Sequence, residues 1–154
     1  MASQNRRLII EQLDSKLAQL SFLNNFTFSS TGWIKTIRQA LNISLKQLSK
    51  RLGVTLQNVK QLEEREIDGT ISINKLKQTA DALDMKLVYV FIPKDESLSK
   101  LIEKKALQKA KDIVLRTSHS MQLEDQENTE KRIQAAIIEK ADEIKKEMPK
   151  YLWD

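Results

Sequence analysis

The residue types that usually carry enzymatic chemistry are scarce in this chain of 154 residues. It has no cysteine and a single histidine, His119, so thiol catalysis, disulfides and thiolate or histidine-rich metal sites are not expected. Its three glycines are scattered, which leaves no glycine-rich phosphate loop. Acids adjoin at Glu63 and Glu64 and at Glu124 and Asp125, in polar surroundings that would not separate their pKa values. We therefore predict that the chain is not an enzyme and holds no metal or cofactor.

Residues that could bind phosphate are concentrated in one block. The chain carries 26 Lys and Arg against 21 Asp and Glu, a net charge of +5. Residues 32–94 contain 11 basic and 6 acidic residues, which is the whole of that excess, because the rest of the chain has 15 of each. A local positive excess favours approach to a nucleic-acid backbone. The alternative is a lysine-rich solvated surface.

The elements that would position these residues are predicted to be helices. Three Gly and two Pro are too few for an all-β fold, and 40% hydrophobic residues suffice for a modest core. Helical spacing occurs over residues 5–20, 32–41, 45–52, 56–66, 73–84, 97–121 and 129–148. No apolar run could span a membrane and no signal-peptide core is present, which predicts a cytoplasmic protein.

We divide the chain into three predicted parts. Residues 1–31 form an N-terminal helix and a linker, residues 32–94 a DNA-binding domain with a terminal strand, and residues 95–154 a C-terminal helical extension. The linker carries three aromatic residues, Phe22, Phe26 and Phe28, that could anchor it.

The most specific pattern is LKQLSKRLGVTLQNVKQL, at residues 45–62. A helix-turn-helix needs a small residue where its two helices cross, and Ser49 suits that place. Four residues later, Gly53 can adopt the left-handed turn conformation. Ser44 and Thr55 can cap the two helices. The apolar residues at core-facing offsets are Leu48, Leu52, Val54, Val59 and Leu62. The segment is therefore predicted to be a helix-turn-helix.

Around this motif, residues 34–84 resemble the XRE family of phage-repressor-type DNA-binding domains. The resemblance implies that the second helix of the motif enters the major groove with its N-terminus first. It assigns base reading to Gln57 and Gln61, with Asn58 and Leu56 beside them. Glutamine can form two hydrogen bonds with one adenine edge, which suits it to this role. The alternative is that these are solvated helix residues.

The resemblance also implies structural and phosphate-contacting residues. Arg38 and Glu63 match an ion pair that ties the first helix of the domain to the end of the recognition helix, although Arg38 could also face a phosphate. The expected contacts to the DNA backbone are Lys35, Arg38, Lys46, Lys50, Arg51, Thr55 and Lys60. The chain departs from the family at Leu45, where a phosphate-bridging glutamine is usual. Leucine cannot donate a hydrogen bond, so Leu45 is expected to touch sugar, a thymine methyl group or another protein element.

Residues 86–92, KLVYVFI, are β-branched and aromatic, which predicts one β-strand ended by Pro93. A single strand in a helical chain lacks a partner, so we expect it to pair with its copy in a homodimer. The dimerisation residues would be Leu87, Val88, Tyr89, Val90 and Phe91. A buried extended segment in a monomer is the alternative. The predicted fold class is mainly α: a phage-repressor-like helix-turn-helix bundle with one β-strand and N- and C-terminal helical extensions.

A narrower resemblance covers residues 30–128. It is carried by GWIKTIRQALNISLKQLSKRLGV, EEREIDGTISINKLKQTADALDMKLVYVFIP and SMQLEDQ, which are similar to a group of bacterial proteins called mobile mystery protein A. Members of that group occur on mobile elements beside a Fic-domain protein, which implies a two-gene module resembling toxin–antitoxin pairs. Ser120 and Glu124 resemble the residues of a helix that blocks the Fic nucleotide site, and they would share one helix face. A solvated helix end is the alternative.

Two functions follow from these observations. The first is a sequence-specific DNA-binding regulator that binds its own operator, represses its own operon and serves as the antitoxin of the pair. The second is a protein interaction module whose C-terminal helices neutralise a partner enzyme, with DNA binding secondary. Its support includes the aromatic tail at Tyr151 and Trp153. It also includes a narrow apolar stripe suited to a helix partner, formed by Ile133, Ile137, Ala141, Ile144 and Met148.

Overall fold

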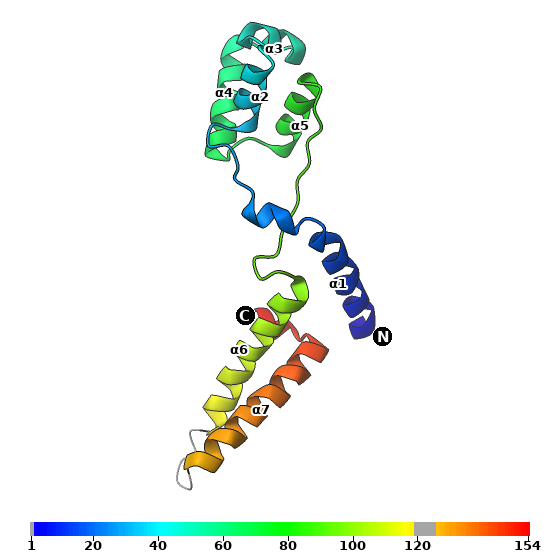
Figure 1. The fold of residues 1–154 in the computed structure, drawn as a ribbon, viewed down its shortest axis with the longest axis vertical. Coiled ribbons are helices and arrows are strands. Elements are labelled where there is room, and N and C mark those ends of the chain that lie inside the picture. The colour runs from blue at the N-terminus through cyan, green and yellow to red at the C-terminus, as the bar shows by residue number, and fades with distance from the viewer. Residues whose placement is uncertain (1, 119–125) are drawn as a thin grey trace. The chain divides into compact units, whose positions relative to one another are not determined.

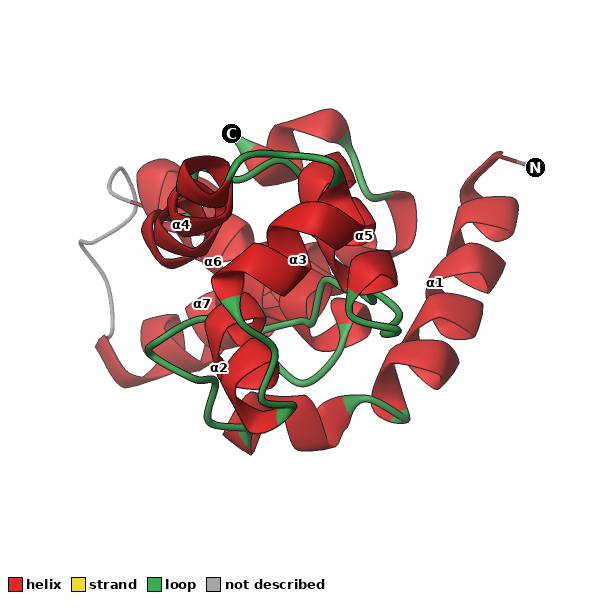
Figure 2. Ribbon diagram, turned by 90° about the horizontal axis from the view of Figure 1, so that it is seen from above, coloured by secondary structure: helices red, strands yellow, loops and turns green. Residues whose placement is uncertain are grey.

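The computed structural model of this chain describes residues 2–118 and 126–154. These residues are mainly helical, as predicted, and contain no β-strand (Figures 1 and 2). In chain order the elements are α1 (Ala2–Ala18), η1 (Ser21–Asn25), α2 (Trp33–Ala40), α3 (Leu45–Leu52), α4 (Leu56–Asp68), α5 (Ile73–Ala82), α6 (Leu98–Ser118), α7 (Gln126–Glu147) and η2 (Lys150–Trp153).

The described chain forms two compact units. One is Asn25–Phe91, which contains α2 to α5 and is called the helix-turn-helix unit below. The other, the hairpin unit, consists of the remaining described residues and contains α1, α6, α7 and η2. The helices that precede and follow the helix-turn-helix unit in sequence therefore belong to one unit.

Three of the four helices of the helix-turn-helix unit begin directly after a residue whose side chain caps them. The Ser44 hydroxyl accepts the N–H of Gln47, while the Gln47 side chain accepts the N–H of Ser44, which makes a complete capping box for α3. Thr55 caps α4 and Ser72 caps α5 in the same way, each through its hydroxyl oxygen. These caps satisfy backbone donors that a helix cannot satisfy within itself.

A small apolar core closes the helix-turn-helix unit. Its buried members are Ile34, Leu48, Val59 and Leu83. Three of them come from α2, α3 and α4, and Leu52 and Val54 pack against them, as their offsets predicted. Leu62 is half-buried but lies outside this cluster. The core thus holds three successive helices around the turn.

The hairpin unit is built on α6 and α7, which run antiparallel (Figure 1). Its buried residues are Ile102, Ala106, Ala110, Ile137, Ile144 and Leu152. The apolar stripe of α7 packs against this core, so its helix partner is α6 of the same chain and not another protein. The stripe therefore no longer supports the second function. This helix begins at Gln126, three residues before the start of the predicted helix at residue 129.

The C-terminal tail and α1 both dock on this hairpin. Leu152 is 2% exposed in the core, whereas Tyr151 and Trp153 are about half exposed. Asp14 of α1 accepts hydrogen bonds from the N–H groups of Leu98 (2.7 Å) and Ser99 (3.1 Å) and from the Ser99 hydroxyl (2.6 Å). A carboxylate from α1 therefore caps α6.

Residues 86–92 form no strand in the described chain. No described residue shares a backbone–backbone hydrogen bond with residues 86–94. Val88, Tyr89 and Phe91 are 74%, 69% and 89% exposed, which contradicts the alternative of a buried segment in a monomer. A strand needs a second backbone to pair with, so pairing with a second copy stays a prediction.

Candidate nucleic-acid interface

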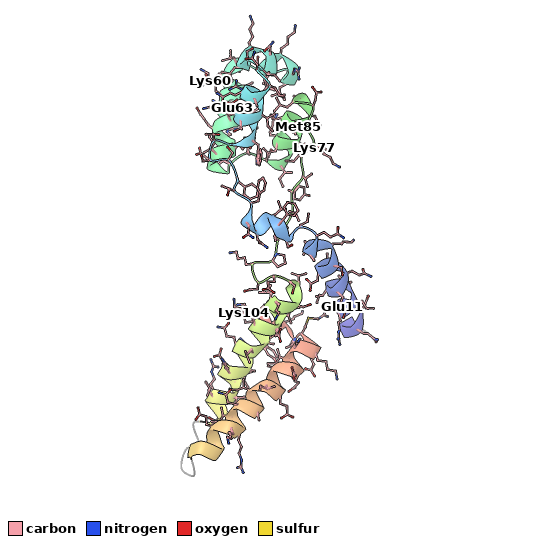
Figure 3. The ribbon with its side chains drawn as sticks, in the orientation of Figure 1. Glu11, Lys60, Glu63, Lys77, Met85 and Lys104 are labelled. Carbon is pink, nitrogen blue, oxygen red and sulfur yellow. The ribbon has the colours of Figure 1, made fainter. Side chains whose placement is uncertain are left out.

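The first turns of α4 present the four residues predicted to read bases. Gln57 and Gln61 are four residues apart on the helix and share the face opposite the fully buried Val59. Both are exposed, as are Asn58 and Leu56. All four are therefore accessible on the first turns of α4, with Leu56 and Asn58 on either side of the face that Gln57 and Gln61 share. Figure 3 shows Lys60 on the outer side of the same helix.

The turn between α3 and α4 sets the direction of that surface. Gly53 has φ 65° and ψ 31°, the left-handed conformation that glycine adopts without steric cost. The N–H of Gly53 is bonded to the carbonyl of Lys50 and that of Val54 to the carbonyl of Ser49, which completes a Schellman motif. Ser49 is 8% exposed, so the predicted small residue lies inside the packed turn.

A buried ion pair ties α4 to α2. Arg38 Nε donates to Glu63 Oε1 over 2.6 Å, and Arg38 Nη2 lies 3.3 Å from Glu63 Oε2. Arg38 Nη1 also donates to the carbonyl of Ile43 over 3.1 Å. The two side chains are only 11% and 10% exposed. Because its guanidinium is buried and occupied, we omit Arg38 from the phosphate contacts proposed below.

A second carboxylate contact joins α4 and α2, and the sequence analysis did not predict it. The Glu66 side chain accepts the N–H of Trp33 (2.8 Å) and that of Ile34 (2.9 Å), so the last turns of α4 cap the start of α2. Gly32 has φ 78°, and a Cβ there would lie 2.7 Å from Glu66 Oε2. The sequence holds one signal for this contact: the residue before α2 is Gly32, which has no side chain to cap the helix, so a cap has to come from another segment.

Three of the predicted phosphate-binding lysines are well placed. Lys46, Lys50 and Lys60 are exposed and form no ion pair with any residue that the structure describes. Lys46 and Lys50 lie four residues apart on α3, so they share a face. These side chains can reach a phosphate without first breaking an ion pair.

Of the other predicted backbone contacts, two make local hydrogen bonds and one is half-buried. Lys35 is half-buried on α2. Arg51 Nη1 donates to the carbonyl of Ala82 (3.0 Å) and lies 3.3 Å from Asp84, so it also secures the end of α5. The Thr55 hydroxyl accepts the N–H of Asn58 over 3.2 Å, and its own hydrogen stays available to an acceptor.

The charge of α4 changes sign along its length. Its first half carries Lys60 and no acid, while its second half carries Glu63, Glu64, Glu66 and Asp68 against Arg65. The N-terminus of a helix also carries the positive end of its dipole. A polyanion is therefore attracted to the first turns of α4 and repelled by the last, which favours approach of DNA to the N-terminal end.

Leu45, where the chain departs from the family that it resembles, and Leu56, which is predicted to lie beside the base-reading glutamines, differ in environment. Leu45 is partly buried and packs against the core, so it contacts another part of the protein. Leu56 is 41% exposed at the start of α4, where an apolar side chain can touch a thymine methyl group. Ser120, Glu124 and His119 lie outside the described residues.

Comparison with known families assigns this unit. Residues 34–90 match the model of a helix-turn-helix family. The comparisons with curated proteins and with solved structures give no significant match. This match supports a helix-turn-helix domain of the XRE type over those residues, and with it a DNA-binding transcription regulator. In the described part of the chain, no helix is long and apolar enough to cross a membrane.

Proposed function

We propose that this protein is a sequence-specific regulator that binds double-stranded DNA at its own operator and represses its own operon. The observation that carries the proposal is the exposed row of amide side chains on the first turns of α4. That row is held by the Arg38–Glu63 pair and the Gly53 turn, and lysines without ion-pair partners in the described chain flank it. Rigid placement of readout residues is what sequence discrimination requires.

In this proposal each residue type has a separate task. Gln57 and Gln61 form paired hydrogen bonds with base edges, Asn58 adds a further amide and Leu56 contacts a thymine methyl group. Lys46, Lys50, Lys60, Thr55, Arg51 and Lys35 hold the DNA backbone and set the register. Base contacts would discriminate among sequences, while the backbone contacts would strengthen binding to any duplex.

We also propose that the protein binds DNA as a homodimer paired through residues 87–91. Support comes from the unpaired backbone of this segment beside its exposed apolar side chains, because such a segment gains most from adding a second strand. A two-stranded ribbon is marginal by itself. The exposed aromatic cluster of the same unit, Phe26, Phe28 and Trp33, could supply the additional apolar area.

Analytical ultracentrifugation of a Val88→Lys, Val90→Lys variant tests the dimer. We expect the wild type to sediment as a dimer and the variant as a monomer, since buried charges would oppose pairing. Ile138→Lys is the control, because it makes the same chemical change at a 58% exposed residue of the hairpin unit. A variant that remains dimeric would exclude this segment as the interface.

Fluorescence anisotropy tests the regulator itself. The purified chain is titrated onto duplex DNA from its own upstream region and onto a scrambled duplex, each at two salt concentrations. We expect tighter binding to its own DNA and a steep loss of affinity as salt rises. Equal binding to both duplexes would contradict sequence-specific regulation.

A second proposed function is neutralisation of a Fic-domain partner encoded beside this chain, which would make the protein an antitoxin. Its support is the resemblance of residues 30–128 to mobile mystery protein A, together with Ser120 and Glu124. The test compares this chain with a Ser120→Ala, Glu124→Ala variant, both for co-purification with the product of the neighbouring gene and for inhibition of that product's activity. Loss of inhibition with retained complex formation would support inhibition by these two residues, and unchanged inhibition would contradict it.

A further inference from the structure

The hairpin unit separates charge between its two long helices. Of the residues in α6, six are basic (Lys100, Lys104, Lys105, Lys109, Lys111 and Arg116) and two are acidic. By contrast, α7 carries five basic and six acidic residues. The charge balance of the chain outside residues 32–94 therefore conceals one strongly basic helix.

Three of the α6 lysines form a line on its outer face. Lys100, Lys104 and Lys111 are all exposed. At about 100° per residue they lie within about 40° of one another around the helix, on the side away from the buried Ile102 and Ala106. Figure 3 shows Lys104 on the side of α6 that faces away from α7. The line extends over roughly 16 Å along the helix axis.

Most of this positive charge is not neutralised within the described chain. Lys100 and Lys111 form no ion pair with any other residue that the structure describes. Lys104 Nζ lies 2.8 Å from Asp95 in an exposed contact. Exposed ion pairs contribute little and exchange readily with other partners.

We propose that this lysine face of α6 is a second DNA-binding surface that holds backbone phosphates without reading sequence. The inference rests on the proposed regulator function and adds to it a contact from outside the helix-turn-helix unit. A row of lysines suits phosphates, because duplex DNA carries one negative charge for about every 1.7 Å of its axis. Lysine binds phosphate as a point charge and carries no base information.

The composition of the face favours DNA over a protein partner. Protein interfaces are enriched in aromatic residues and arginine and depleted in lysine. The line of lysines contains no aromatic residue, which also excludes a stacking platform for single-stranded nucleic acid. Leu107 and Leu115, which are 38% and 49% exposed, are its nearest apolar neighbours by helical position.

The test compares two full-length variants with the same change of net charge. One is Lys100→Gln, Lys104→Gln, Lys111→Gln. The control is Lys131→Gln, Arg132→Gln, Lys150→Gln, which removes three exposed cations of the same unit that lie outside the face. Glutamine is close to lysine in helix propensity, so both variants should fold. Circular dichroism and tryptophan fluorescence would verify this.

Affinity is measured by anisotropy over a series of salt concentrations. The probes are the upstream duplex, extended about two helical turns beyond the operator on each side, and its scrambled counterpart. For the α6 variant we expect the slope of log K against log salt to fall by about 0.9 for each phosphate that is no longer neutralised. Its preference for the upstream duplex over the scrambled one should stay the same. The control variant should keep the wild-type slope.

The outcomes separate this inference from the proposed function. An unchanged slope in the α6 variant, or an equal fall in the control, would overturn the inference while the wild type still distinguishes its own DNA. The α6 face would then be assigned to an acidic protein partner. If the wild type fails to distinguish the two duplexes, the regulator proposal falls. In that case, a smaller salt slope in the α6 variant alone would still support the phosphate surface. An unchanged slope in that variant would refute the phosphate surface.

Discussion

The two units of this protein are stabilised in different ways. The helix-turn-helix unit consists of helices of 8, 8, 13 and 10 residues, and isolated helices of such length are marginal in water. Its helices are held by caps at Ser44, Thr55 and Ser72 and by carboxylates that reach from α4 to α2. Directional polar contacts therefore place its exposed residues accurately.

The hairpin unit relies on length and apolar packing instead. Its α6 and α7 have 21 and 22 residues, and isoleucine and alanine side chains fill the seam between them. Its polar residues are mostly left on the surface, where they can bind other charges. One unit thus uses buried polar contacts to orient a readout surface, while the other leaves its cations available.

The largest expected effect comes from breaking the buried ion pair of the helix-turn-helix unit. Glu63→Ala leaves Arg38 buried without its counter-ion, which should lower the free energy of unfolding of this unit by about 3–5 kcal/mol. Chemical denaturation followed by Trp33 fluorescence, in a Trp153→Phe background, would measure it. Glu64→Ala is the matched control, because Glu64 is exposed and forms no ion pair in the described chain. Equal effects of the two substitutions would show that the pair is dispensable.

The corresponding test in the hairpin unit removes apolar volume. Ile144 is 1% exposed, so Ile144→Ala should destabilise this unit by about 2–5 kcal/mol through reduced burial and a cavity. Trp153 fluorescence in a Trp33→Phe background follows this unit. Ile138→Ala, at a 58% exposed residue of the same helix, should change stability little. Equal losses of stability in Ile144→Ala and Ile138→Ala would contradict stabilisation of this unit by its apolar core.

A smaller effect is expected from the readout residues, and on binding alone. Gln57→Ala or Gln61→Ala should cost about 1–3 kcal/mol of specific DNA binding and relax base preference, since each removes a paired hydrogen bond. Anisotropy with the operator and with singly substituted duplexes would measure this, beside unfolding curves that should match the wild type. Unchanged specificity in both variants would remove these glutamines from the readout set.

The smallest effect concerns the contact between α1 and α6 and depends on pH. Partial burial raises the pKa of the Asp14 carboxyl. Hydrogen bonds from the Ser99 hydroxyl and from the amides of Leu98 and Ser99 together lower that pKa by more than burial raises it, so it lies below the usual 3.8. Since the folded pKa is the lower one, this stabilisation is complete above the unfolded value and is lost as the pH falls through the folded value.

Nuclear magnetic resonance would follow that titration through the amide shifts of Leu98 and Ser99. We expect a midpoint below pH 3.8, and we expect no titration in an Asp14→Asn variant. This variant keeps an acceptor oxygen but loses the charge at the start of α6, which should weaken docking of α1 by about 0.3–1 kcal/mol. A midpoint at or above 3.8 would contradict the capping role of Asp14.

Much of the helix-turn-helix unit could be predicted because its signals are local. A helix start depends on one hydroxyl and a few backbone amides, so Ser44, Thr55 and Ser72 mark the starts of three helices in the sequence alone. The turn at Gly53 depends on the absence of a Cβ, which is equally local. Exposure of Gln57 and Gln61 then follows from burial of Val59 on the opposite face.

Other features depend on residues far apart in the chain. Glu66 carries no mark in the sequence that it caps the N-terminus of α2, and nothing around Asp14 shows that it caps a helix 84 residues later. The stripe of α7 indicates a helix partner but not whether that partner is α6 or another protein, because apolar burial is not directional.

The sequence by itself therefore determined the helical class, the position of the helix-turn-helix and the residues that its second helix can present. The tertiary structure decided which partner each surface meets: α6 for the stripe of α7, Glu63 for Arg38, and solvent for the lysine line of α6. The physical reason is the separation along the chain of the residues that each interaction joins. Caps and turns are complete within a few residues, whereas burial and ion pairing are settled only when distant segments pack together.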